Sequence, residues 1–349
     1  MSEDKSQKLH VIATEEAFAI PEYLEAFMKV AATSKSSGIR VPALILGRKE
    51  MRSRLCDIDV RLAEMDANGV DMHLMSLTSP GVQIFDADLG TSLASKINDR
   101  MAELIRQHPT RLAGLAAIAP QDPKRAAAEI ERAIIGLGLN GIIVNSHTNG
   151  EFLDDPKFYP ILEAAQKHQA AIYIHPTFPA EEMIKPFQRY ALDGALWGFA
   201  AETGLHAIRM VMGGVFDRFP ELRIVLGHMG ESLPFFLFRF DNVLEFLMSH
   251  PQKPPGMVEL KRRPSEYIKS NMYITTSGMF WNELLDFGIK AMGADRIIFA
   301  IDYPYESSKK ACGWIENAPI SLAEKEMILS DTAQKVFKIR TAPSAVEAG

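Results

Sequence analysis

Short runs of apolar residues, each bounded by turn residues, recur along the chain and predict eight β-strands. Several runs, among them GIIVN, AIYI, RIVLG and RIIFAI, are apolar without alternation, which is typical of strands buried on both faces of a parallel sheet. The predicted strands are Leu9–Thr14, Asp71–Leu77, Leu112–Ile118, Gly141–Asn145, Ala171–Ile174, Arg223–Leu226, Met272–Thr276 and Arg296–Ile301.

Segments with a helical period of apolar residues lie between most of these strands or after the last one. The predicted helices are Asp59–Asn68, Leu89–His108, Pro123–Leu137, Phe158–His168 and Leu322–Phe337. Because parallel strands need crossover connections, this alternation predicts an α/β fold, and we favour a (β/α)8 TIM barrel over a doubly wound sheet. We expect residues 1–340 to form the barrel as one domain and the tail 341–349 to be disordered.

Two connections are longer than usual and read as inserts into the barrel. Ala31–Leu55, after the first strand, is rich in Lys, Ser and Arg, and we expect a lid or a subunit arm. Phe178–Glu221, after the fifth strand, is rich in aromatic residues, and we expect a long loop plus two helices. Such segments shape pockets or oligomer contacts, so we expect a homo-oligomer.

Composition narrows the class of protein. With 47% hydrophobic and 23% charged residues, the chain has the amino-acid composition of an ordinary globular protein. The 38 basic and 44 acidic residues give a net charge of −6, which argues against nucleic acid as a partner. No apolar run approaches the roughly 20 residues of a membrane span, and no signal peptide is evident. Cys56 and Cys312 lack disulfide or zinc spacing, so we expect a cytoplasmic protein with no membrane partner.

Polar residues follow four of the predicted strands. In a barrel the carboxyl ends of the strands meet on one face, which brings together Glu15, His175, His228 and Asp302. One such histidine alone would more often be a hydrogen-bonded core residue. Imidazoles and carboxylates without a thiolate suit one divalent ion, Mn²⁺ or Zn²⁺, and leave positions open for water or substrate. The sequence therefore predicts a metal site.

Four segments, VIATEEAFAIP, YIHP, LGHMGESLP and FAIDYPYE, resemble the amidohydrolase superfamily, and in it the metal-dependent aromatic acid decarboxylases. The resemblance spans nearly the whole chain, and its opening is fairly specific because most amidohydrolases begin with HxH. It implies that Glu15, His175 and Asp302 hold the metal, with His228 beside it as ligand or proton partner. It also implies a homodimer or homotetramer.

Two positions leave the substrate open among γ-resorcylate, 2,3-dihydroxybenzoate and 5-carboxyvanillate. γ-Resorcylate decarboxylases look to carry a histidine two residues after the ligating glutamate, whereas this chain has Ala17 there, which argues against γ-resorcylate. Glu231, three residues after His228, resembles the glutamate of the dihydroxybenzoate-type enzymes, whereas 5-carboxyvanillate decarboxylases look to have arginine at this position. The substrate is thus a small aromatic carboxylic acid, its ring substituents undecided.

The chemistry of this branch explains the same residues. An arene loses CO₂ only after the carbon bearing the carboxylate is protonated, and a metal that chelates the carboxylate and an ortho phenolate oxygen helps that step. Asp302 would deliver the proton, which requires a raised pKa. Glu231 would orient and charge-stabilise His228, which completes an Asp302–His228–Glu231 relay.

Candidate substrate contacts are weaker signals. The resemblance favours a substrate-carboxylate or subunit role for Arg61, and the alternative is a solvated helix residue paired with Glu64 or Asp57. Phe178 and Tyr303 are expected to line an apolar pocket for a flat ring, although such aromatics are more often core residues. Phe18, Phe187 and Phe199 are further candidates for that pocket.

Two other functions compete with decarboxylation. A hydrolase of the same superfamily, acting on an ester, lactone or amide, would bind metal equally well and use Asp302 as base. A catalytically silent barrel whose metal stabilises an oligomer is the third hypothesis, against which the intact set of Asp302, His228 and Glu231 argues. No nucleotide or thiamine motif is present, so no organic cofactor is expected. Among the other histidines, only His147 follows a predicted strand directly.

Overall fold

Eight parallel strands form one sheet in which each strand pairs with its neighbour in sequence. The structure is a computed structural model, and it describes residues 9–340. The strands are β1 Ile12–Phe18, β2 Met72–Leu77, β3 Leu112–Ala117, β4 Gly141–Val144, β5 Ala171–Ile174, β6 Ile224–Leu226, β7 Met272–Thr275 and β8 Ile297–Ile298. The ring closes where Thr14 bridges Ala300 and its amide donates to the Phe299 carbonyl at 3.0 Å. The predicted (β/α)8 barrel is confirmed, and the doubly wound alternative is wrong.

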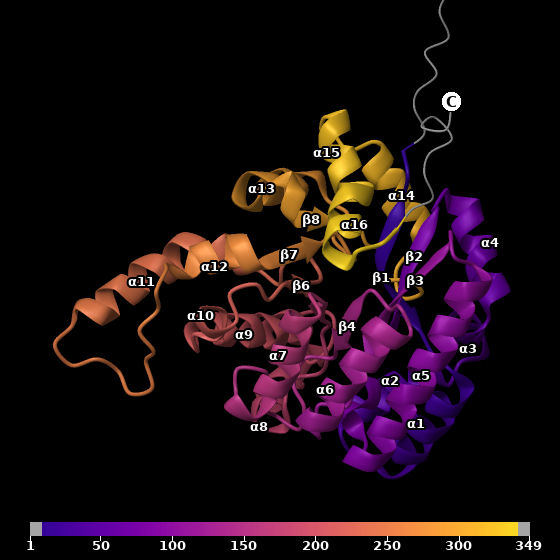
Figure 1. Cartoon of the computed structure of the whole chain (residues 1–349), viewed down its shortest axis with the longest axis horizontal. Helices are drawn as coiled ribbons and strands as arrows, with labels where there is room; N and C mark the ends of the chain where they lie inside the picture. The colour runs from indigo at the N-terminus through magenta and orange to yellow at the C-terminus, as the bar shows by residue number, and fades with distance from the viewer. Residues whose placement is uncertain (1–8, 341–349) are drawn as a thin grey trace, which may run out of the picture.

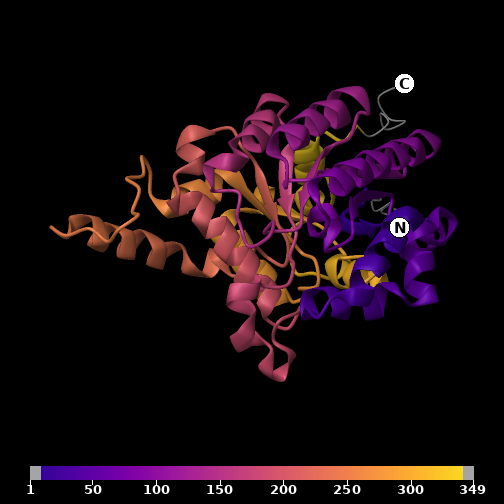
Figure 2. The same ribbon diagram turned by 90° about the horizontal axis from the view of Figure 1, so that it is seen from below.

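Helices surround the strands (Figures 1 and 2). They are α1 Pro21–Thr33, α2 Ser37–Leu46, α3 Lys49–Cys56, α4 Ile58–Asn68, α5 Ala87–Gln107, α6 Pro123–Glu131, α7 Tyr159–Lys167, α8 Glu181–Ile184, α9 Gly198–Met212, α10 Val215–Arg218, α11 Leu237–Ser249, α12 Pro264–Asn271, α13 Asn282–Met292, α14 Ser308–Glu316, α15 Leu322–Glu326 and α16 Thr332–Phe337. All five predicted helices are present, the last one divided at a π-helical turn, Met327–Asp331.

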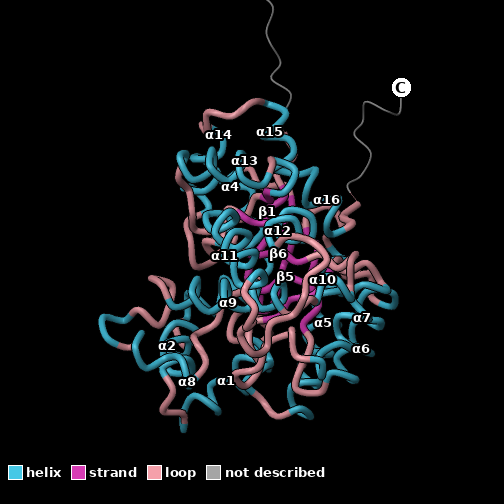
Figure 3. The backbone as a smooth tube through the Cα atoms, turned by 90° about the vertical axis from the view of Figure 1, so that its left-hand side faces the viewer, coloured by secondary structure: helices cyan, strands magenta, loops and turns pink. Residues whose placement is uncertain are grey.

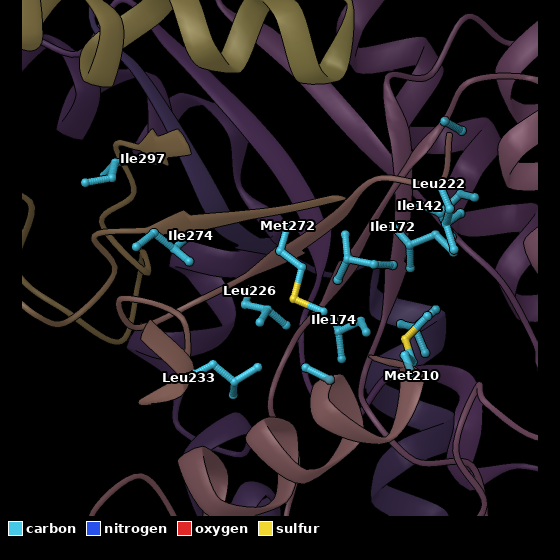
Figure 4. Packing of buried hydrophobic residues seen from close by; sticks show 14 of the residues in the cluster. Ile142, Ile172, Ile174, Met210, Leu222, Leu226, Leu233, Met272, Ile274 and Ile297 are labelled. Atoms are coloured by element: carbon cyan, nitrogen blue, oxygen red, sulfur yellow. The ribbon is translucent and has the colours of Figure 1, made fainter. Parts of the chain in front are cut away.

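The core lies between the strands and the helices that cover them. Every strand residue is buried, as the unbroken apolar runs predict. Ile172 and Ile174 of β5 pack in one cluster with Met210 of α9 (Figure 4). Tyr173 between them points the other way, into the barrel, where its hydroxyl contacts Thr275. This alternation puts every second strand residue inside the barrel, below the strand ends.

The first strand differs from its predicted range, Leu9–Thr14. It begins at Ile12 and continues through Glu15 and Glu16 to Phe18. The pairing with β2 shifts between Ala13 and Glu16, which leaves one extra residue in β1, and Glu15 has a φ of 67°. Such a β-bulge re-aims side chains. Because both glutamates find partners inside the barrel, two charged residues can occupy a buried strand, and the apolar pattern misplaced its end.

The two long connections are mostly helical and contact each other. The connection after β1 holds α2 and α3, and the one after β5 holds α8, α9 and α10. Ser37 Oγ donates to Asp193 Oδ2 at 2.9 Å, and a Cβ built on Gly38 would lie 3.0 Å from Phe178 Cβ. Figure 3 shows α2 and α8 at the same end of the molecule. We predicted two helices after β5, and three are present, of which α8 and α10 have only four residues each. The role of the connection after β1 as a lid or subunit arm stays a prediction.

Helix α11 and the loop after it extend away from the barrel (Figures 1 and 2). No residue of α11 is buried, and Phe238 and Phe246 are 81% and 65% exposed. None of the helices in residues 9–340 is long and apolar enough to cross a membrane. The tail 341–349 lies outside the described residues, so its predicted disorder and the 1–340 domain boundary stay predictions.

Candidate metal and catalytic site

Three side chains meet at the carboxyl ends of the strands and form a metal triad, namely Glu15, His175 and Asp302. One ligand atom of each lies within 4.8 Å of those of the other two. His175 Nε2 is 3.5 Å from Glu15 Oε1. His228 Nε2 lies 3.8 Å from the same oxygen and 3.9 Å from Asp302 Oδ2, at the border of the triad. All four residues predicted from the strand ends therefore converge.

Glu15 is held by one of its two carboxylate oxygens. Its Oε2 accepts hydrogen bonds from the Tyr173 hydroxyl and from Thr275 Oγ1, the latter at 3.1 Å. Oε1 is buried and has no hydrogen-bond partner among residues 9–340. A Cβ on Gly227 would stand 2.9 Å from it, so glycine is needed there. A buried anionic oxygen without a donor is costly unless a cation pairs with it, and this observation fits a bound divalent ion.

His175 is prepared as a ligand by the hydrogen bond on its other nitrogen. Its Nδ1 lies 2.8 Å from the Pro176 carbonyl, and because a carbonyl only accepts, Nδ1 carries the proton. Nε2 is then free to bind metal, the usual arrangement of ligating histidines. The side chains of His175 and Asp302 are 14% and 16% exposed, while that of Glu15 is 1% exposed. His175 and Asp302 are therefore partly accessible to solvent, whereas Glu15 is not.

His228 and Glu231 lie on a left-handed turn, residues 228–232, in which every φ is between 49° and 80°. This conformation is disfavoured for residues other than glycine, and here it places positions three apart on the same side. His228 Nδ1 donates to Glu231 Oε1 at 2.8 Å, and the His228 amide donates to Ser277 Oγ at 3.0 Å. Burial would lower the pKa of His228, but the Glu231 and Glu15 carboxylates outweigh it and hold that pKa well above its usual value.

Asp302 has the raised pKa that a proton donor requires. Burial raises it, the nearby His228 ring lowers it, the Glu15 charge raises it again, and the resulting pKa is about 6. The backbone of Asp302 is also left-handed, with a φ of 73°. Its carbonyl accepts from the Tyr305 and Glu306 amides at 2.8 and 3.0 Å, which starts a turn directly after the site.

Arg61 and Tyr303 pack together behind the site. Arg61 is 1% exposed, it donates to the Ala17 carbonyl, and its NH1 lies 3.2 Å from His73 Nδ1. Its guanidinium lies 4.6 Å from the centre of the Tyr303 ring, and Arg54 lies 4.7 Å from it. The alternative of a solvated Arg61 is wrong, since burial excludes it. Contact with substrate stays a prediction for both residues.

Phe178 lies in the connection after β5, 8% exposed, with its ring 5.2 Å from that of Phe199 in an edge-to-face contact. His147 Nε2 donates to the Phe178 carbonyl at 3.0 Å, and His147 Nδ1 accepts from the Gly150 amide at 3.1 Å. His147 therefore ties the loop after β4 to the predicted pocket wall. Binding of substrate by Phe178 stays a prediction.

A buried polar cluster, Ser146, Glu202 and His206, lies behind the 228–232 turn. Ser146 Oγ donates to Glu202 Oε1 at 2.8 Å and lies 3.1 Å from His206 Nδ1, while His206 Nε2 accepts from the Leu153 amide. Burial raises the pKa of Glu202 to about 8, and burial lowers the pKa of His206 to about 3. The cluster is therefore neutral near pH 7. A Cβ on Gly204 of α9 would lie 2.9 Å from the Glu231 carbonyl, so α9 packs directly on the turn.

Strand-end reasoning missed the residues that support the triad. Tyr173 carried a signal, because it precedes His175 by two and so faces the same side of its strand. Gly227 and Gly230 flank His228 in the sequence and mark its special backbone. Nothing in the spacing singled out Thr275 or Glu202, whose partners come from elements far away in the sequence.

Comparison with known proteins shows which family this chain resembles. The family model described as Amidohydrolase matches residues 9–339. The chain is 38% identical to a γ-resorcylate decarboxylase of Polaromonas sp. strain JS666, which covers 83% of this chain and 90% of that one. It resembles the crystal structure of 5-carboxyvanillate decarboxylase from Sphingomonas paucimobilis, with a TM-score of 0.91, 43% identity, and coverage of 95% and 100% of the two chains.

A third relative contains a metal. The 5-carboxyvanillate decarboxylase of Novosphingobium aromaticivorans, complexed with manganese and 4-hydroxy-3-methoxy-5-nitrobenzoic acid, has a TM-score of 0.91 and 36% identity. The match covers 95% of this chain and 97% of that one. Its manganese supports the predicted choice of Mn²⁺ or Zn²⁺, for which the metal triad offers a candidate site. The chain belongs to the amidohydrolase superfamily, in its branch of aromatic acid decarboxylases.

Proposed function

We propose that this chain is a non-oxidative, metal-dependent decarboxylase of a small benzoate with a hydroxyl group ortho to its carboxylate. The observation that carries the proposal is the unpaired Oε1 of Glu15, which faces His175 and His228 at a partly open barrel mouth. The relatives support it, since a γ-resorcylate decarboxylase, a 5-carboxyvanillate decarboxylase and a dihydroxybenzoic acid decarboxylase each match most of the chain at 36% to 43% identity. They favour a lyase over the hydrolase alternative.

The metal triad would hold one divalent ion, Mn²⁺ or Zn²⁺, through a carboxylate oxygen of Glu15, His175 Nε2 and a carboxylate oxygen of Asp302. When bound, such an ion supplies Lewis-acid chemistry, holding the substrate carboxylate and the ortho phenolate oxygen together. Three protein ligands leave coordination positions open for these two oxygens. His228, which stands outside the triad, serves as the proton partner in this proposal.

Asp302 donates a proton to the ring carbon that bears the carboxylate. A C–H bond forms there, the bond to the carboxylate breaks, and its electron pair restores the aromatic ring as CO₂ departs. In the metal-free protein, burial and the Glu15 charge raise the pKa of Asp302 to about 6, which favours the protonated carboxyl that a general acid requires. Asp302 is left as carboxylate and regains a proton through His228, whose Nε2 is 3.9 Å away.

Glu231 holds His228 in that role. The 2.8 Å hydrogen bond from Nδ1 fixes the ring, directs Nε2 toward Asp302 and stabilises the imidazolium. The same arrangement of carboxylate, imidazole and reacting group recurs in other catalytic sites because it fixes both orientation and protonation. Asp302, His228 and Glu231 thus form the proposed relay.

Arg61, Phe178 and Tyr303 are proposed to contribute to substrate binding. Phe178 sits where the two long connections touch, and its apolar ring suits the wall of a pocket for a flat aromatic acid. Arg61 and Tyr303 are buried, and we propose that they act on substrate by fixing the segment next to Asp302.

The ring substituents are open to direct test. Metal-reconstituted protein is incubated with 2,3-dihydroxybenzoate, γ-resorcylate, salicylate and 5-carboxyvanillate, and the phenolic products are identified by mass spectrometry. We expect one acid to lose CO₂ and chelation of the metal to stop the reaction. Intact acids with metal bound, together with cleavage of an ester or lactone panel, would contradict the proposal in favour of a hydrolase.

We propose further that the protein is a homodimer or homotetramer in which a second copy covers α11. The exposed Phe238 and Phe246 of α11, together with Phe235 in the turn just before it, support this, since gathered exposed apolar residues mark interaction surfaces. Light scattering coupled to size exclusion should give a multiple of the 38.8 kDa chain, and Phe238→Ser should lower it. A monomer at micromolar concentration would contradict this part.

The cellular setting is proposed to be the cytoplasm, without a nucleic-acid or membrane partner. The net charge of −6 and the two free cysteines support this.

A further inference from the structure

Glu16 follows the metal ligand Glu15 directly, yet its carboxylate is used differently. Glu16 is 0% exposed, and its side chain binds the backbone that follows β8, across the junction of β1 and β8 that closes the barrel. Oε1 accepts from the Ile301 amide at 3.0 Å, and Oε2 accepts from the Tyr303 amide at 3.1 Å. The two amides belong to the residues on either side of Asp302. Both oxygens of one buried carboxylate thus bracket the third member of the metal triad.

Asp302 needs such support because of its backbone. A φ of 73° is disfavoured for aspartate, and strained conformations persist only where the surroundings over-determine them. The Ala17 amide donates to the Tyr303 carbonyl at 2.7 Å, so β1 holds the segment at a third point. Regular pairing of β8 ends at Ile298, before this segment begins, so sheet hydrogen bonds alone do not fix it.

Arg61 belongs to the surroundings of Glu16. Burial raises the pKa of Glu16 well above its usual value, although the two backbone amides and the Arg61 guanidinium lower it. Arg61 is itself buried and donates to the Ala17 carbonyl, directly next to Glu16. Amide, carboxylate and guanidinium groups therefore form one buried network that joins β1, α4 and the segment after β8.

We propose that Glu16 is a positioning residue of the metal centre, which holds the backbone around Asp302 so that its carboxylate faces Glu15 and His175 before an ion arrives. The inference rests on the proposed function for the metal but needs no particular substrate. It assigns different tasks to two consecutive carboxylates, one a ligand and one a clamp. The bulge in β1 makes this possible, because it turns both side chains inward.

Manganese affinity of the purified full chain tests this, measured by calorimetry and by the electron paramagnetic resonance of free Mn²⁺. Glu16→Gln keeps the size but sets an amide NH₂ against one of the two backbone N–H groups. We expect Mn²⁺ to bind roughly 10 to 100 times more weakly, the usual effect of removing a group that orients a ligand. The matched control is Glu129→Gln on α6, another buried glutamate with three hydrogen bonds, expected to leave the affinity unchanged. Unchanged affinity in folded Glu16→Gln would overturn the proposal.

Glu16→Asp separates position from charge, since it keeps the carboxylate but is one methylene too short to reach both amides. We expect it also to weaken Mn²⁺ binding. Full affinity in Glu16→Asp beside a loss in Glu16→Gln would assign the effect to charge alone and overturn the clamp.

Hydrogen exchange of the wild-type protein covers the case in which neither variant folds. The amides of Ile301 and Tyr303 should be protected in the metal-free protein already, and Mn²⁺ should change their exchange less than twofold. If both exchange freely until Mn²⁺ is added, the ion and not Glu16 fixes this segment. Neither measurement involves turnover, so failure of the decarboxylase proposal and failure of this one are distinguishable.

Discussion

The two sides of the site satisfy their polar groups in different ways. On the side of β1 and β8, the triad leaves Glu15 Oε1 buried without a donor among the described residues. On the side of the 228–232 turn, His228 and Glu231 are paired at 2.8 Å, and the turn is tied to Ser277. One side has an excess of negative charge that a cation would balance, whereas the other holds a proton between its own groups.

This difference indicates that the side of β1 and β8 binds the metal ion and that the side of the 228–232 turn transfers the proton. A buried anionic oxygen without a hydrogen-bond donor is stabilised by a bound cation, whereas a carboxylate paired with an imidazole keeps that imidazole charged and oriented. Asp302 belongs to both sides, since it is a member of the triad and lies 3.9 Å from His228 Nε2. Variants should therefore separate into those that lose metal, those that lose turnover, and the one residue where both are lost.

Asp302→Asn should have the largest effect, because it removes a ligand and the proposed proton donor at once. We expect kcat to fall by about a thousandfold or more, in the range of general-acid catalysis, and Mn²⁺ to bind more weakly. Steady-state kinetics at saturating Mn²⁺ measure the first effect. Asp286→Asn, an exposed carboxylate paired with Lys290, is the control. Turnover near that of the wild type would remove Asp302 from the mechanism.

Gly227→Ala should damage the metal side alone. The added Cβ would stand 2.9 and 3.0 Å from the two carboxylate oxygens of Glu15 and force that side chain away. We expect Mn²⁺ affinity to fall by about a hundredfold, with most of kcat recovered at high Mn²⁺. Gly313→Ala, where nothing lies within 4 Å of the new methyl group, should bind normally. Equal affinity in the two variants would show that Glu15 does not hold the ion.

Glu231→Gln should slow turnover and leave metal binding unchanged. It keeps the shape of the turn but removes the charge that sustains His228, so the pKa of His228 should fall and kcat should drop by about 10 to 50 times. Calorimetry should find Mn²⁺ affinity within twofold of the wild type. Loss of metal in this variant would mean that the two sides are not separate.

Glu202→Gln should have the smallest effect, on stability against pH. Since the pKa of Glu202 is about 8 in the folded protein and 4.5 for the free group, folding favours its protonated form. That stabilisation is complete below about pH 4.5 and is lost as pH rises toward 8. Between pH 6.5 and 7.5 we expect the wild type to lose on the order of 1 kcal/mol relative to Glu202→Gln. Parallel urea-unfolding profiles at the two pH values would show that Glu202 is already ionised.

The sequence was sufficient for the barrel and for the four residues that meet at its mouth. Unbroken apolar runs identify buried parallel strands, and the fold then brings His175, His228 and Asp302 together by architecture alone. The resemblance to the decarboxylase branch also predicted that Glu231 orients His228, and a left-handed turn brings the two side chains together.

What the sequence did not reveal depends on contacts between distant strands. The bulge that places Glu15 inside β1 is visible only in its register with β2, so the predicted strand ended too early. Likewise, nothing local distinguishes Glu16, which binds amides 285 and 287 residues away. The burial of Arg61 follows from the packing of α4 against Tyr303, which a helical pattern does not specify.

The central claim is that this site protonates a ring carbon as CO₂ leaves. It is tested most directly by running the reaction of the preferred acid in D₂O with Mn²⁺-loaded protein and analysing the product by mass spectrometry and NMR. The account predicts one deuterium, located at the carbon that bore the carboxylate, and an equal amount of CO₂. A product that gained the elements of water, or that lost CO₂ without deuterium at that carbon, would contradict it.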